Sequence, residues 1–238
     1  MRQFLDIKRA HPDAVVFFRL GDFYEMFFDD AILAARELDL TLTSRDKGKE
    51  DAVPMCGVPH HAARGYIARL TERGHKVGLA EQVEDPRHAK GLVKREVVRV
   101  ITPGVVLDDD VLEPKRARYL AAIVGGRGEP GQRFGLAYLD VSTGELRATE
   151  LAGAGGLDDE LARVAPREVL VREGELAAGP LAGLRLRHPD AAWTTIVPMP
   201  DDAAGVLLVE VLGASMIEIC LRDRPLAARA PAAVLVYA

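Results

Sequence analysis

The residue types of this chain change abruptly near its middle. Six of the seven Lys residues precede position 100, five of the six His residues precede position 89, and six of the seven Phe residues precede position 29. The second half is rich in Arg, Ala, Leu and Val instead, and an acidic, proline-containing stretch at 108–115 separates the two parts. Because 238 residues are enough for two domains of ordinary size, this change predicts one domain over 1–110 and a second over 111–238.

The composition is typical of a globular cytoplasmic protein. Hydrophobic residues make up 48% of the chain and charged residues 28%, and no apolar run reaches the roughly 18 residues that cross a membrane. The first residues, MRQFLDIKRAHPD, carry charges where a signal peptide has its apolar core. The two cysteines, Cys56 and Cys220, form no CxxC pair, so neither a disulfide framework nor a zinc site is predicted.

The first half predicts an α/β domain built on a mixed sheet. Helices are expected at 1–11 and 62–73, and strands at 14–20, 41–43, 76–82 and 95–102. The stretch from Phe23 to Leu38 places apolar residues at three-four spacing, which predicts a helix that begins next to Asp22.

The second half predicts a different α/β domain. Three apolar runs at 119–124, 134–141 and 145–151 are separated by turn residues and indicate a β-meander. Helices at 157–164 and 201–212, the latter capped by Asp201 or Asp202, are expected to alternate with strands at 168–171 and 184–187. Three antiparallel strands followed by alternating units are typical of an RNase H-like sheet flanked by helices.

The segment FFRLGDFYEMFF at 17–28 holds six of the thirteen aromatic residues. If Asp22 caps a helix, Glu25 three residues later completes a capping box. On that helix Phe23 lies off the apolar stripe that contains Tyr24 and Phe28, on a side that becomes charged within two turns. Phe23 is therefore either packed in the first turn or an exposed binding group, and both readings stay open at this point.

Several ordered blocks carry a resemblance to a known family. FFRLGDFYEMF, LDLTLTSR, PMCGVPHHA, YIARL, GLAEQVEDP, VKREVVRVITPG and GLAYLDVSTGE resemble the N-terminal part of bacterial MutS DNA mismatch repair proteins, closely up to about residue 150 and more loosely beyond it. The resemblance implies a mismatch-recognition domain followed by a connector domain of RNase H-like fold. It also implies duplex DNA with mismatches or small loops as ligand, a MutL-type protein as partner, and a homodimer in the full-length protein.

The resemblance also assigns residues. Phe23 and Glu25 match the aromatic residue and the acid that read the mismatch in this family. Phe23 would enter from the minor groove, because a mismatched step unstacks and bends more easily than a paired one. Glu25 would accept a hydrogen bond from the displaced base, either protonated or facing a base donor, and would repel intact pairs.

Positions 45–99 carry 12 Lys and Arg against 8 Asp and Glu, although the whole chain has a net charge of −5. Contacts to the DNA backbone need cations, and the candidates are Arg45, Lys94, Arg95 and Arg99. Each could equally be an ordinary solvated cation. Met55 could flank Phe23 in the groove or be a buried packing residue.

No catalytic activity is expected of this chain. The GxxxxGK[ST] pattern that cradles nucleotide phosphates is absent, and Gly48-Lys49-Glu50 matches only its end. The resemblance to MutS proteins implies an ATPase, so ATP and Mg²⁺ would be bound by other parts of the parent protein, and no cofactor is expected on this chain. The chain is interpreted as an N-terminal module of such a protein or as a stand-alone relative.

Two alternatives remain open. Asp140 on a strand of an RNase H-like sheet could belong to a metal-dependent nuclease, although Glu145, Glu168 and Glu210 show no spacing signature and Asp140 is equally explained by a turn. The acidic second domain could instead be a pure protein-interaction module. The histidines at 60, 61, 75 and 88 lack i, i+4 spacing and carboxylate partners, so no metal site is predicted.

Overall fold

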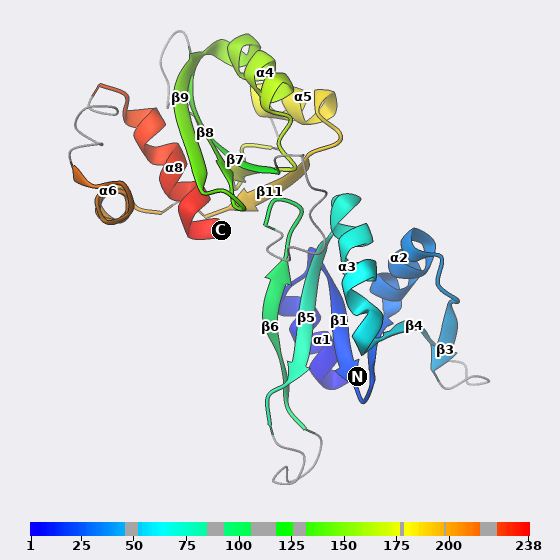
Figure 1. Ribbon diagram of the computed structural model, residues 1–238. Helices are drawn as coiled ribbons and strands as arrows, with labels where there is room; N and C mark the ends of the chain where they lie inside the picture. The colour runs from blue at the N-terminus through cyan, green and yellow to red at the C-terminus, as the bar shows by residue number, and fades with distance from the viewer. Residues whose placement is uncertain are drawn as a thin grey trace. The chain divides into compact units, whose positions relative to one another are not determined.

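The computed structural model describes residues 1–45, 52–84, 93–105, 118–125, 132–176, 179–197, 199–214 and 223–238. Among these residues the chain forms two compact units, Met1–Pro103 and a second unit that begins at Gly104 and ends at Ala238 (Figure 1). Residues 106–117, which include most of the predicted boundary region, lie outside the described part. Each unit is a mixed β-sheet covered by helices, so the predicted α/β fold class is confirmed.

Over 1–45, 52–84 and 93–103, the described part of the first unit, the sheet has six strands. They are β1 (Ala14–Leu20), β2 (Phe23–Phe27), β3 (Thr43–Arg45), β4 (Val53–Pro59), β5 (Lys76–Gln82) and β6 (Arg95–Ile101), in the order β3-β4-β2-β1-β5-β6. Of these six described strands, β1 and β5 pair in parallel, and the other neighbouring pairs are antiparallel. β4 was not predicted, because its residues include Pro54 and Gly57, which are unfavourable inside strands.

Helices cover both faces of this sheet. Helix α1 (Arg2–Ala10) packs on one face, where Phe4 makes edge-to-face contacts with Phe18 and Phe27 at centroid distances of 5.9 and 5.2 Å. Helices α2 (Phe28–Leu38) and α3 (Ala63–Glu72), the second preceded by the short 3₁₀ turn η1 (His60–Ala62), pack on the other face (Figure 1). The sheet is therefore buried on both sides except at its ends and edges.

The predicted helix from Phe23 to Leu38 is wrong at its beginning. Residues 23–27 form strand β2, and the helix begins only at Phe28, whose φ of 54° marks the change of conformation. Gly21 and Asp22 form a two-residue hairpin turn with Gly21 at φ 59°, which brings Phe23 opposite Leu20. Pairing with β1 and β4 on either side outweighs the local helical pattern, and Asp22 and Glu25 form no capping box.

Among the residues of the second unit that are described, five strands form the sheet. They are β7 (Tyr119–Gly125), β8 (Arg133–Asp140), β9 (Glu145–Ala152), β10 (Glu168–Arg172) and β11 (Ala192–Ile196), in the order β11-β10-β7-β8-β9. β7, β8 and β9 form the predicted antiparallel meander, while β10 lies parallel to β7 and β11 parallel to β10. This is the strand order of the RNase H-like arrangement that the sequence predicted.

In the part of the chain that the structure describes, helices cover both faces of this second sheet. Helices α4 (Gly153–Val164) and α5 (Pro180–Arg187) pack on one face, and α8 (Pro225–Tyr237) packs on the other. Helix α6 (Asp201–Leu212) packs on α8. Within the described ranges, no helix is long and apolar enough to cross a membrane.

Two local predictions in this unit are wrong. Residues 184–187 form the last turn of α5 and not a strand, because Leu181 and Leu184 are both buried at helical spacing and Pro180 suits the first helical position. Asp201 and Asp202 do not cap α6 with their side chains. The cap position is Pro200, and both acids lie in the first turn.

Candidate nucleic-acid interface

The β1–β2 hairpin displays Phe23 at one end of the first sheet. Phe23 is the first residue of β2, and it pairs with Leu20 of β1 on one side and Pro59 of β4 on the other. Its side chain is 47% exposed although strands flank it on both sides. The structure therefore favours the exposed reading of Phe23, through the geometry of a strand and not of a helix.

The alternation of strand β2 places Phe23 and Glu25 on the same face of the sheet. Glu25 is half-buried, and its register partners are Phe18 in β1 and Gly57 in β4. Gly57 is exposed, and a Cβ at this position would lie 3.2 Å from the Tyr24 backbone oxygen and 3.5 Å from Cγ of Glu25. The absence of a side chain at Gly57 leaves the surface beside Glu25 open on the β4 side.

Lys94 and Arg95 lie at the same end of the sheet as the hairpin, because β6 starts where the parallel strands β1 and β5 end. The Nε of Arg95 donates to the backbone oxygen of Arg19 at 2.6 Å, and the guanidinium lies 5.2 Å from the centroid of the Phe18 ring. Burial lowers the pKa of Arg95. Lys94 is exposed and forms an ion pair with Glu96 at 2.5 Å. Arg95 therefore braces β6 against β1, whereas Lys94 faces solvent.

The other three candidates lie farther from the hairpin. Arg99 lies on β6 four residues after Arg95 and is half-buried. Met55 is partly buried against the cluster of Phe4, Phe18 and Phe27 under α1. Arg45 ends β3 opposite Val53. Val53 is six residues along β4 from Pro59, which corresponds to roughly 20 Å. The side chain of Arg45 lies outside the part that the structure describes.

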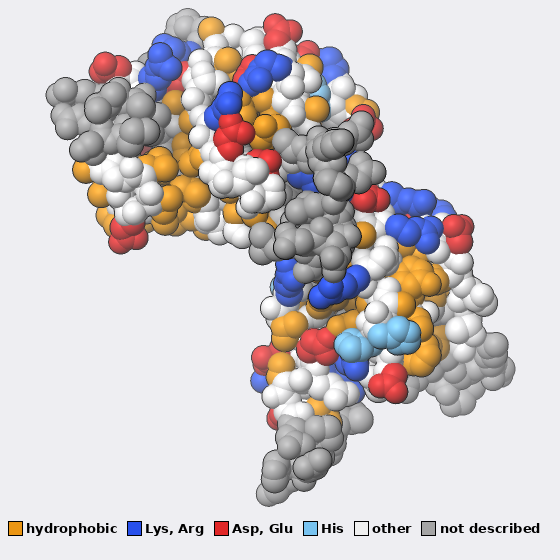
Figure 2. Space-filling view, viewed as in Figure 1, with side chains coloured by type: hydrophobic (Ala, Val, Ile, Leu, Met, Phe, Trp, Pro, Cys, Tyr) orange, Lys and Arg blue, Asp and Glu red, His pale blue; other side chains and the backbone are white. Residues whose placement is uncertain are grey.

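The face of the sheet opposite Phe23 carries a polar cluster that the sequence reading missed. Its members are Arg19, Tyr24, His60 and Glu81, which come from four different segments. In the first unit, histidine side chains lie beside hydrophobic ones on the face seen in Figure 2. The signal that could have revealed part of this cluster was the two-residue turn after Leu20, because a hairpin there pairs Arg19 with Tyr24.

The acids of the nuclease alternative point to opposite faces of the second sheet. Asp140 lies two residues after Tyr138 on β8 and therefore on the same face of the sheet, the face whose core is covered by α4 and α5. Glu168 lies two residues before Leu170 on β10 and shares its face of the sheet, the face covered by α8. The Glu168 carboxylate accepts a hydrogen bond from the Tyr237 hydroxyl of α8 at 2.8 Å. A two-metal site needs converging carboxylates, and these two diverge.

Asp140 and the two other acids of the nuclease alternative have different roles. Asp140 shapes the turn after β8, since its Oδ1 accepts hydrogen bonds from the backbone N–H and the hydroxyl of Ser142 at 3.0 and 2.6 Å. Glu145 is ion-paired along its own strand, and Glu210 is exposed on α6. Among the described residues no group of three His, Cys, Asp or Glu could hold a metal ion. His88 and Cys220 lie outside those residues.

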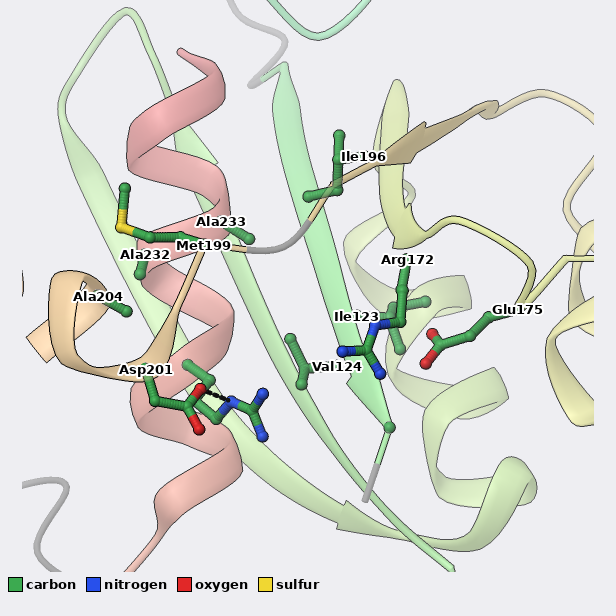
Figure 3. A pocket seen from close by; sticks show the side chains of 12 residues that line it. Ile123, Val124, Arg172, Glu175, Ile196, Met199, Asp201, Ala204, Ala232 and Ala233 are labelled. Atoms are coloured by element: carbon green, nitrogen blue, oxygen red, sulfur yellow. Dashed lines mark ion pairs between the residues drawn. The ribbon is translucent and has the colours of Figure 1, made fainter. Parts of the chain in front are cut away.

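A cavity in the second unit lies at the carboxyl ends of the parallel strands β7, β10 and β11 (Figure 3). It encloses about 590 Å³ of space, part of it open to solvent, over a mostly aliphatic floor. Arg172 and Glu175 line one side, and Asp201, which pairs with Arg229 at 2.9 Å, lines the other. Its two acids and two bases balance in charge, which is unlike the acid-rich site of a two-metal nuclease.

These observations define a class of protein: a two-domain α/β protein that displays an aromatic residue and an acid on a hairpin and continues into a sheet of RNase H-like order. Comparison with protein families identifies which one. Residues 1–110 match the family model described as MutS domain I, and residues 118–187 match the model described as MutS domain II. The chain belongs to the MutS family.

Curated relatives agree with this assignment. The chain is 48% identical over 241 residues to the DNA mismatch repair protein MutS of Myxococcus xanthus, and 48% identical over 251 residues to that of Sorangium cellulosum; each match covers 100% of this chain and 26% of the relative. The MutS of Syntrophobacter fumaroxidans is 55% identical over 175 residues, which cover 74% of this chain and 20% of the relative. The chain thus spans about a quarter of the length of the relatives that it matches over its whole length.

Among solved structures, the chain is similar to the Holliday junction resolvase of fowlpox virus. The match has a TM-score of 0.35 and 10% identity, and it covers 50% of this chain and 96% of the resolvase. A similarity of this size supports no conclusion about function.

Proposed function

We propose that this chain recognises mismatched double-stranded DNA by inserting the Phe23 ring at the mispair from the minor groove. The observation that carries the proposal is the 47% exposure of the Phe23 side chain at the end of β2, although β1 and β4 pair with this strand on either side. Glu25 lies on the same face of the strand. Membership of the MutS family and relatives named as DNA mismatch repair proteins support it.

An aromatic ring suits this task for two physical reasons. A mismatched step costs less to unstack and kink than a paired one, so the ring enters more readily at an error. Stacking on a base contributes about 1–3 kcal/mol and does not depend strongly on base identity, because every base has a π-face. One phenylalanine can therefore serve many different mispairs.

Glu25 adds hydrogen-bond discrimination to the insertion of the Phe23 ring. Its carboxylate lies two residues from Phe23 on the same face, so a base displaced by the ring comes within its reach. Gly57 leaves the approach open from the β4 side. A carboxylate near DNA is repelled by phosphates and by acceptors on intact pairs, so it favours a displaced base that offers a donor.

Contacts to the DNA backbone supply affinity without sequence information. Lys94 at the hairpin end of the sheet and Arg45 roughly 20 Å along β4 are far enough apart to contact different phosphates of one duplex. Arg99 is a further candidate on β6. In contrast, Arg95 is engaged by β1 and supports the interface from within.

The second domain acts as a connector in this proposal. It contributes no catalysis of its own, it transmits the state of the DNA-binding domain to the ATPase part of a longer protein, and it offers a surface to a MutL-type partner. Helix α6 carries three exposed valines, Val206, Val209 and Val211, at 61%, 46% and 52%, which suits contact with another protein surface. The protein would work in the cytoplasm as a homodimer.

The proposal is tested by titrating the chain, at low salt, onto fluorescently labelled duplexes with and without a single G·T mispair. Phe23→Ala should remove the preference for the mismatched duplex, weakening binding to it by about 5- to 150-fold, which corresponds to the stacking energy. Leu42→Ala is the matched control, because Leu42 is also 47% exposed on the first unit and has no proposed DNA contact.

Four results would contradict this function. Equal binding of both duplexes by the unchanged chain would show no mismatch recognition, and so would the absence of any binding. A mismatch preference that survives Phe23→Ala, or that Leu42→Ala removes equally, would exclude the wedge role of Phe23.

A further inference from the structure

Tyr24, Arg19 and Glu81 form one row across three neighbouring strands. Tyr24 of β2 is the register partner of Arg19 in β1, and Glu81 of β5 follows Ala80, the register partner of Phe18. Because side chains alternate along a strand, this row lies on the face opposite Phe23 and Glu25. The row thus lies directly behind the proposed wedge.

The row is connected from end to end. The Tyr24 hydroxyl donates a hydrogen bond to the Glu81 carboxylate and thereby links β2 to β5 across β1. The guanidinium carbon of Arg19 lies 5.6 Å from the centroid of the Tyr24 ring. Burial, and then the hydrogen bond to Glu81, raise the pKa of Tyr24 to about 12, so the hydroxyl stays protonated as the donor at neutral pH.

The same cluster holds both residues of the hairpin turn. The Nε of Arg19 donates to the backbone oxygen of Gly21 at 2.5 Å, and the backbone N–H of His60 donates to the backbone oxygen of Asp22 at 2.8 Å. The His60 ring lies 5.9 Å from the Tyr24 ring, centroid to centroid. The turn that precedes Phe23 is therefore fixed from behind by groups that belong to β1 and η1.

We propose that Tyr24 and Glu81 are positioning residues for mismatch recognition, because their hydrogen bond holds the β1–β2 hairpin in the orientation that presents Phe23. The inference rests on the proposed function of Phe23. Tyr24 is only 5% exposed, so it acts through the hairpin and not by touching DNA. Phe23 and Tyr24 are adjacent on one strand, and any rotation of β2 that withdraws the Phe23 ring must displace the Tyr24 ring from its contacts.

The physical reason is preorganisation. Inserting a ring between bases exerts force on the tip of the hairpin. If the hairpin is not already rigid, part of the binding free energy is lost in ordering it. A site whose supporting contacts are missing is typically displaced or loosened by about 1 Å, which is enough to weaken a geometric interaction strongly. Intact duplex is bound mainly through its phosphate backbone, so the affinity for intact duplex should depend less on the orientation of Phe23.

The test measures the ratio of the dissociation constants for matched and G·T-mismatched duplexes. Tyr24→Phe removes only the hydroxyl, and Glu81→Ala removes the acceptor from the other end; each should lower the ratio by about tenfold. Glu81→Gln keeps a side-chain oxygen that can accept from Tyr24 and should preserve most of the ratio. Tyr66→Phe on α3 of the same unit is the matched hydroxyl deletion and should leave the ratio unchanged.

The decisive comparison is made in the Phe23→Ala background. A positioning role predicts that Tyr24→Phe has no further effect on the ratio there, whereas a general loss of structure would lower binding to both duplexes in either background. Thermal unfolding of each variant, followed by circular dichroism, gives the temperature at which all are folded. If Tyr24→Phe does not fold at any temperature tested, Glu81→Ala and Glu81→Gln provide the comparison.

The outcomes separate the two ideas. If Phe23→Ala removes the mismatch preference but Tyr24→Phe and Glu81→Ala both retain it, the positioning role is overturned and the proposed function stands. If Phe23→Ala retains the preference, or the unchanged chain shows none, the proposed function fails and the positioning role fails with it.

Discussion

Gly135 determines how closely helix α8 approaches the second sheet. It is the third residue of β8, paired with Val124 on one side and Glu150 on the other. A Cβ built on Gly135 would lie 2.2 Å from the backbone oxygen of Leu226 and 2.4 Å from its carbonyl carbon. Since such contacts are normally longer than 3 Å, Gly135→Ala must push the start of α8 away from the sheet by about 1 Å.

The cost of this displacement has two parts. Overpacking of a close contact typically costs about 1–3 kcal/mol. In addition, the N–H groups of Leu226 and Ala227 donate to the Glu150 carboxylate at 2.9 and 3.3 Å, and the Glu150 side chain is only 5% exposed. Hydrogen bonds to a charged group contribute about 1.5–3 kcal/mol. The two parts together amount to about 2.5–6 kcal/mol, so we expect Gly135→Ala to destabilise the second unit by about 4 kcal/mol.

Urea unfolding followed by tryptophan fluorescence measures this change. Trp193, the single tryptophan of the chain, lies in β11 and reports on the second unit. With the usual slope of about 2 kcal/mol per molar urea, the midpoint should fall by about 2 M. Gly205→Ala in α6 is the control, because no atom lies within 4 Å of its Cβ position, and it should stabilise the unit by about 0.5–1 kcal/mol. A loss below 1 kcal/mol for Gly135→Ala would refute the steric argument.

Two further predictions concern titration and reactivity. His188 and Arg187 each lie 2.7 Å from the Asp158 carboxylate and hold the pKa of Asp158 below its usual range. The stability that Asp158 contributes is therefore present above a pH of about 4 and is lost as the pH falls through the lowered pKa. Asp158→Asn should therefore be less stable than the unchanged chain at pH 7 and equally stable near pH 2, and a constant difference in midpoint at both values would contradict this. Burial raises the pKa of the Cys56 thiol to about 11, and the residue is 1% exposed, so in a Cys220→Ser background a thiol reagent at pH 8 should label Cys56 only when the first unit unfolds. Immediate labelling of the folded chain would show that this burial is wrong.

Patterns between near neighbours predicted much of the fold. The meander of the second unit could be read from alternating runs separated by short turns, because antiparallel hairpins form between segments adjacent in sequence. The mixed sheet of the first unit followed from apolar runs such as 14–20 and 76–82. Strand β4 and helix α8 escaped this reading because Pro54 and Pro231 obscure their patterns.

The candidate site was predicted in part. Resemblance to the MutS family assigned Phe23 and Glu25, but the local pattern placed them on a helix. On a helix, residues two positions apart point in different directions, whereas on strand β2 they share a face. Whether this segment becomes strand or helix depends on β4, which lies about 30 residues later in the chain and supplies the hydrogen bonds on the second side of β2.

The sequence by itself therefore determined the change in residue types between the two halves, the family, and the identity of the residues proposed to read DNA. Only the tertiary structure decided which faces these residues occupy and what supports them. Tyr24 meets Glu81 from 57 positions away, and Arg95 meets Arg19 from 76 positions away. Local preferences act over a few residues, but contacts at such separations form only when strand pairing has brought distant segments into register.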